Sequence, residues 1–211
     1  RWLVGMVACA IDDEAQNHQL MLLHGAQGKG KSTFVRHLLP PELKDYYRNG
    51  MISPDNKDHL LQMSSCLLIN LDEFDTLSPA RMQELKSLIT QDVMNERKVY
   101  DIQNYTFIRR ASFIASTNNP HCLPDIGENR RILFNTLLEI DYHTPVNHQG
   151  IYAQAYALYQ QGFQYWYENQ EITFLNNRNE AFRQKDPLEE NLFFLSLIHI
   201  SEPTSLALIS Y

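Results

Sequence analysis

Residues 25–32 read Gly-Ala-Gln-Gly-Lys-Gly-Lys-Ser and match the phosphate-loop pattern G-x-x-x-x-G-K-[ST] at every fixed position. Glycines let the backbone N–H groups of such a loop turn toward an anion, and a following helix N-terminus adds partial positive charge. We expect Lys31 to neutralise the β- and γ-phosphates of ATP and the Ser32 hydroxyl to bind Mg²⁺. An ordinary glycine-rich turn is the alternative. The residues predicted to contact the nucleotide are Gly25, Gln27, Gly28, Lys29, Gly30, Lys31, Ser32 and Thr33.

Two acidic residues, Asp72 and Glu73, directly follow the apolar run 66–71. An ATPase needs one carboxylate that holds Mg²⁺ through water and another that polarises the attacking water. We therefore assign Asp72 to the metal ion and Glu73 to the water. A solvated acidic turn is the alternative, and Asp75 two residues further on favours it.

Two more polar segments complete the set of predicted catalytic groups. Asn118 follows the apolar run 113–116, where its amide can hold the attacking water or sense the γ-phosphate. Arg130 and Arg131 can stabilise transition-state charge on the nucleotide of a neighbouring subunit, as an arginine finger does. Taken alone, the asparagine is equally typical of a turn and the arginines are typical of surface ion pairs.

Residues 97–110 contain two short β-prone runs around a polar turn, with basic residues at both ends and tyrosines near the tip. Such a hairpin can offer cations to phosphates and aromatic rings to unstacked bases. The net charge of −7 provides no global attraction to nucleic acid, so contact with DNA requires a local patch. A surface hairpin balanced by acids is the alternative. The residues predicted to contact single-stranded DNA are Arg97, Lys98, Arg109 and Arg110.

Alternating apolar runs and helical patterns position these groups. Strands are expected over 20–23, 66–71, 111–116 and 132–138, with a short strand or a hairpin over 46–52. Helices are expected over 2–10, 33–39, 58–64, 78–89 and 151–167, the second of them stopped by Pro40 and Pro41. This alternation predicts an α/β fold with a central parallel sheet flanked by helices, and ligands at the carboxyl ends of the strands.

The composition is that of a folded protein, with 44% hydrophobic residues among 211. No apolar run reaches the length of a membrane span, and three widely spaced cysteines favour a reducing cytoplasm. The chain begins with Arg1, so we expect an N-terminal part to be missing. We also expect an ATPase core over 1–145, a helical lid or subunit contact over 146–194, and a non-native read-through tail over 195–211, because 195–204 resembles a translated sequencing adapter.

The ordered set of segments 25–32, 72–73, 116–118 and 127–131 resembles the virulence-associated protein E family of P-loop ATPases, which is related to superfamily-3 helicases and phage primase-helicases. The resemblance covers roughly residues 2–183. It implies an AAA+-like, superfamily-3 helicase-like fold, an ATP·Mg²⁺ site, a Walker B pair at Asp72 and Glu73 and a sensor at Asn118. It further implies a ring-shaped homo-oligomer and a role in the replication of mobile elements.

These observations favour a Mg²⁺-dependent ATPase that acts as a DNA helicase or translocase in phage, plasmid or genomic-island replication. Two alternatives stay open. A small-molecule P-loop kinase would transfer the phosphoryl group to a metabolite, and a nucleotide-gated interaction module would bind ATP without essential hydrolysis.

Overall fold

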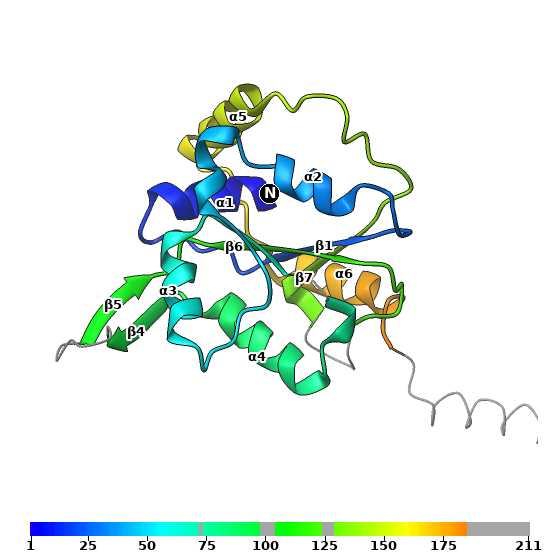
Figure 1. Cartoon of the computed structure of the whole chain (residues 1–211), viewed down its shortest axis with the longest axis horizontal. Coiled ribbons are helices and arrows are strands. Elements are labelled where there is room, and N and C mark those ends of the chain that lie inside the picture. Colours follow the sequence, from blue (N-terminus) through cyan, green and yellow to red (C-terminus); the bar gives the residue numbers. More distant parts are fainter. Residues whose placement is uncertain (72–73, 98–103, 124–128, 185–211) are drawn as a thin grey trace, which may run out of the picture.

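A parallel β-sheet lies at the centre of the molecule (Figure 1). The computed structural model describes residues 1–71, 74–97, 104–123 and 129–184. Within these ranges the sheet has five strands in the order β2-β3-β6-β1-β7. The strands are β1 (Leu20–His24), β2 (Tyr47–Asn49), β3 (Leu68–Leu71), β6 (Ser112–Thr117) and β7 (Ile132–Thr136).

The register of β1 determines which loops meet. Leu20 pairs with Phe113 of β6 on one side and with Ile132 of β7 on the other. All these pairings are parallel, so the strands end at one edge, which we call the carboxyl edge. Strand β3 is buried at all four positions, as expected for a strand covered on both faces.

Helices cover both faces of the sheet (Figure 1). On one face lie α1 (Trp2–Ile11), α2 (Lys31–His37) and α5 (His148–Gln160), and α5 packs on α1. On the other face lie α3 (Lys57–Ser65) and α4 (Pro79–Thr90), while α6 (Asn169–Glu180) packs beside β7. Three short 3-10 helices are η1 (Pro41–Tyr46), η2 (Phe74–Thr76) and η3 (Asn129–Arg131).

Side-chain caps start several of these helices. Ser78 accepts a hydrogen bond from the backbone N–H of Arg81 ahead of α4, and Pro79 occupies the first helical position. Asn56 and Asn147 cap α3 and α5 in the same way. Glu168 and Glu171 form a reciprocal capping box at the start of α6.

Strands β4 (Val93–Arg97) and β5 (Asn104–Ile108) form an antiparallel hairpin that projects from the body of the protein (Figure 1). Val93 pairs with Ile108 at its base and Arg97 with Asn104 at its far end. The hairpin predicted over 97–110 is therefore present, although its first strand begins earlier than the sequence indicated.

One prediction about secondary structure was wrong, and one helix was missed. The helix expected over 151–167 ends at Gln160, because the chain turns at Gly162 with φ of 74°. Phe163 and Trp166 lie beyond it, and α6, which was not predicted, follows. Of the two possibilities for 46–52, the strand is correct, because β2 pairs in parallel with β3.

Candidate nucleotide-binding site

The glycine-rich loop lies between β1 and α2 at the carboxyl edge. Gly28 and Gly30 have φ of 80° and 78°, in the left-handed region where residues with a side chain are strained. The backbone N–H of Gly25 donates to the carbonyl of Thr117 at 3.2 Å, which ties the start of the loop to the end of β6. The sequence therefore places its glycines where this loop conformation requires them.

Lys31 is the first residue of α2, and its side chain is buried, with 7% of the residue exposed. Its Nζ donates to the carbonyls of Gly25 and Ala26, at 2.5 and 2.9 Å, and to Oδ1 of Asn118 at 2.7 Å. Burial lowers the pKa of Lys31, and the nearby Asp75 carboxylate partly opposes that shift. The loop lysine and the amide at the end of β6 are thus brought together. Ser32 next to it is exposed.

Asp75 also belongs to this cluster, although the sequence analysis gave it no role. Its carboxylate accepts hydrogen bonds from the Thr117 hydroxyl and, at 3.2 Å, from the backbone N–H of Asn118. Asp75 therefore holds the end of β6 in place beside Lys31. The available signal was its position three residues beyond Asp72, on the chain that leaves the carboxyl end of β3.

A second contribution that the sequence analysis missed comes from the segment 137–147 between β7 and α5, which we call the strap. Its first residue, Leu137, donates its backbone N–H to the carbonyl of His24 at 2.7 Å. Further along, the ring of Tyr142 lies against Gly30: a Cβ atom added to this glycine would be 2.1 Å from the ring. The strap therefore runs alongside the phosphate loop.

Several predicted site residues are not described. Asp72, Glu73 and Lys98 lie outside the described residues, as do Gly127 and Glu128. Of Arg97 only the backbone position in β4 is described. The roles assigned to these residues stay predictions.

Arg130 and Arg131 lie in η3, directly before β7, and hence at the amino edge of the sheet. The phosphate loop follows β1 at the opposite edge, so the length of β1, about 13 Å at 3.3 Å per residue, separates the arginines from the loop of their own chain. They line a cavity of about 430 Å³ together with His18, Trp166 and Tyr167. This placement excludes them from the nucleotide site of the same subunit.

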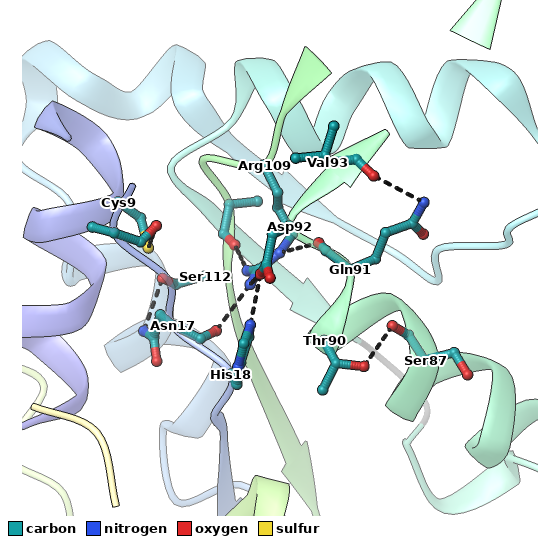
Figure 2. Close-up of polar contacts among 12 residues, drawn as sticks. Cys9, Asn17, His18, Ser87, Thr90, Gln91, Asp92, Val93, Arg109 and Ser112 are labelled. Carbon is teal, nitrogen blue, oxygen red and sulfur yellow. Dashed lines mark hydrogen bonds and ion pairs between the residues drawn. The ribbon is translucent and has the colours of Figure 1, made fainter. Parts of the chain in front are cut away.

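The prediction that Arg109 contacts DNA is wrong. Its side chain is 1% exposed, and it donates to the carbonyls of Gln91 at 2.8 Å, Ala111 at 2.7 Å and Asn17 at 3.3 Å. Figure 2 shows this guanidinium pointing inward, between Asn17 and Gln91 and beside Asp92. Asp92 lies 3.6 Å from Arg109 and 2.6 Å from His18. Arg109 therefore anchors the base of the hairpin to the body of the protein.

Arg110 also has partners within the protein. Its guanidinium donates to the carbonyl of Cys9 at 3.0 Å and forms an ion pair with Asp13. It therefore supports the hairpin base against the end of α1, which weakens the prediction that it contacts DNA.

In the described part of the chain, no three His, Cys, Asp or Glu side chains gather in a way that could hold a metal ion. Nor does a helix of the described ranges combine the length and the apolar character needed to cross a bilayer.

The sheet, the glycine-rich loop between β1 and α2 and the surrounding helices define an α/β P-loop fold, with a central parallel sheet flanked by helices. The sequence profile of the virulence-associated protein E-like domain matches residues 1–184, and the chain belongs to this family. The family match confirms the resemblance seen in the sequence, and the sheet confirms the predicted α/β fold with a central parallel sheet flanked by helices.

Comparison with curated proteins gives no match. Solved structures similar to the chain include the A-form apo structure of the NrS-1 C-terminal region 305–718, with 15% identity and a TM-score of 0.46. A further apo structure of that region has 17% identity and a TM-score of 0.46. The chain spans 38% and 39% of the length of these two chains, which cover 86% of it.

Proposed function

We propose that this domain is a Mg²⁺-dependent ATPase that acts on DNA, as a helicase or translocase, in the replication of a phage, plasmid or genomic island. The observation that carries the proposal is the contact between Lys31 and Asn118 at the carboxyl edge. It joins the phosphate loop after β1 to the polar end of β6, where a triphosphate needs a cation and a water-orienting amide. Membership in the virulence-associated protein E-like family supports the link to mobile elements.

The residues present fit ATP and Mg²⁺. A Cβ atom added to Gly28 would have no atom within 4 Å, so the middle of the loop is open to a ligand at this residue. Lys31 supplies the cation for the phosphates, and the exposed Ser32 supplies a hydroxyl for the metal ion, together with Asp72. Bound Mg²⁺ would neutralise charge on the phosphates and polarise them for attack.

The other groups of the site act on the attacking water. Glu73 would accept its proton, and the Asn118 amide would orient it. Asp75 accepts hydrogen bonds from the Thr117 hydroxyl and from the Asn118 backbone, so it would keep the amide in place. Lys31 would exchange the Gly25 and Ala26 carbonyls for a phosphate oxygen, because an anion attracts an ammonium group more strongly than a neutral carbonyl does where water is largely excluded.

Arg130 and Arg131 would act on the nucleotide of a neighbouring subunit, since their own loop lies at the other edge of the sheet. In a closed ring of subunits arranged head to tail, the amino edge of one sheet would meet the phosphate loop of the neighbouring subunit. A mixture of Arg130→Ala and Lys31→Ala subunits tests this, because some interfaces then pair an intact loop with intact arginines. Hydrolysis should recover in the mixture, whereas each variant alone is inactive; no recovery refutes the assignment.

The DNA contact would come from the far end of the β4–β5 hairpin, at Arg97 and Lys98, because Arg109 is buried at its base. Lys98→Ala should weaken binding of single-stranded DNA and lower the salt dependence by about one counterion. The matched control is Lys44→Ala, at an exposed position in η1.

The decisive experiment measures ATP hydrolysis by the full-length protein with and without single-stranded DNA. We expect DNA to stimulate hydrolysis and Lys31→Ala to abolish it, while Lys44→Ala leaves it unchanged. Phosphoryl transfer to a metabolite without stimulation by DNA would favour a kinase instead. Full biological activity of Glu73→Gln would favour a binding module in which hydrolysis is not essential.

A further inference from the structure

The order of the strands determines on which side of the phosphate loop a nucleoside must lie. Asn118 follows β6 and Asp75 follows β3, and both of these strands are on the same side of β1. The γ-phosphate must face these polar groups, because the attacking water is oriented there. Since a triphosphate is a linear chain, the sugar and base must leave the loop on the other side of β1, toward β7.

The strap occupies that side. It follows β7, and its first residue lies against the first glycine of the loop: the Leu137 carbonyl is 3.0 Å from a Cβ atom added to Gly25. Five residues later the ring of Tyr142 lies against Gly30. In Figure 1 the strap runs past α2 on its way from β7 to α5.

Hydrogen bonds before and after Tyr142 support the path of the strap. Asp141 holds the turn around it through hydrogen bonds from the backbone N–H groups of His143 and Thr144, at 3.1 and 3.0 Å. Beyond the strap, the His148 ring bonds the carbonyl of His37 at 2.7 Å, and the Tyr152 hydroxyl donates to the carbonyl of Leu38 at 3.0 Å. The chain beyond the strap is thus fastened to the carboxyl end of α2.

The aromatic side chain of Tyr142 is also suited to contact a nucleobase. It is half-buried, so part of its ring is available to a ligand, and its ring lies 4.2 Å from that of His143, centroid to centroid. Aromatic side chains hold nucleobases by stacking, which depends little on the identity of the base.

We propose that Tyr142 forms the nucleoside subsite of the phosphate loop and contacts the sugar and base of the bound nucleotide. The inference rests on the proposed function, since it requires a nucleoside triphosphate in the loop. It goes further by naming the residue that distinguishes a nucleotide from a bare polyphosphate.

The test compares the affinities of the full-length protein for ATP and for inorganic tripolyphosphate, each with Mg²⁺, by isothermal titration. Tyr142→Ala should weaken ATP binding roughly 5- to 140-fold, the cost of losing one stacked base, and leave tripolyphosphate binding within about twofold. Tyr142→Phe keeps the ring and should stay near wild type for both ligands. Tyr156→Ala, an exposed tyrosine on α5, is the matched control.

Three results would overturn the inference. Unchanged ATP binding by Tyr142→Ala would show that the ring does not touch the nucleotide. Equal weakening for both ligands would show that the ring only supports the loop, and tighter binding of both would show that it blocks the site. The proposed nucleotide site itself fails if the wild-type protein binds neither ligand, or if the Lys31→Ala variant binds both as tightly as the wild type does. This inference would then fail with it.

Discussion

Replacing Arg109 tests whether this arginine is a structural anchor rather than a DNA contact. Arg109→Ala removes two short hydrogen bonds, at 2.8 and 2.7 Å, from a guanidinium to the carbonyls of Gln91 and Ala111. Hydrogen bonds of charged groups contribute about 1.5–3 kcal/mol each, so these two contribute about 3–6 kcal/mol together. Removing the arginine also relieves its own desolvation, so we expect the unfolding free energy to fall by about 3–5 kcal/mol.

The neighbouring arginine provides the control. Arg110 is 29% exposed and has an exposed partner in Asp13, with one further hydrogen bond to the Cys9 carbonyl. Exposed ion pairs contribute little, so Arg110→Ala should cost only about 1 kcal/mol. Arg109→Lys keeps the charge but not the planar fork, and should fall between wild type and Arg109→Ala.

The assay is urea unfolding followed by circular dichroism, with single-stranded DNA affinity measured on the same samples under native conditions. Equal destabilisation by Arg109→Ala and Arg110→Ala would refute the reasoning. So would a loss of DNA affinity in Arg109→Ala without loss of stability, because that result would place the side chain on the DNA.

Three further predictions concern other parts of the molecule. Burial raises the pKa of the Cys9 and Cys122 thiols to about 11, from an ordinary value of 9.0. The folded state therefore keeps protons that the unfolded state releases, and the unfolding free energy should fall as the pH rises from about 9 to about 11, a slope that Cys122→Ala should reduce. Gly162→Ala places a side chain at φ of 74° and should cost about 1 kcal/mol in urea unfolding, in spite of open space around it. Asp75→Ala should reduce ATP turnover about 10- to 100-fold by releasing Asn118, while KM changes little; steady-state kinetics would contradict this if KM alone rose.

The sequence predicted the parts of the fold that depend on local patterns. The apolar runs that became β1, β3, β6 and β7 are short and bounded by polar residues, which is typical of buried parallel strands. The phosphate loop could be predicted equally well, because its glycines, lysine and serine are close together in the sequence. Gly162 also indicates the end of a helix, but the regular spacing of tyrosines beyond Ile151 favours a longer helix.

The rest depended on contacts between distant residues. Nothing near Arg109 in the sequence indicates that Asn17 and Gln91 surround it, so the pattern of a basic residue beside a hairpin predicts a DNA contact instead. Tyr142 lies in a segment without helical or strand periodicity, and its place beside Gly30 follows only from the position of β7 next to β1. The role of Asp75 could not be predicted either, because its partners Thr117 and Asn118 lie at the end of another strand.

The central position of β1 has a consequence for the order in which the protein folds. Leu20 has Phe113 and Ile132 as its partners, so β1 has no neighbour to pair with until the chain through β6 has been made. Pairings between such distant residues form slowly, since a large loop must close before any contact is gained. During synthesis, the phosphate loop and α2 therefore emerge before the strands that flank β1 exist. The β4–β5 hairpin, in contrast, can form from neighbouring residues alone. The segments that meet at the loop come from both neighbours of β1, which makes this site one of the last features of the domain to form.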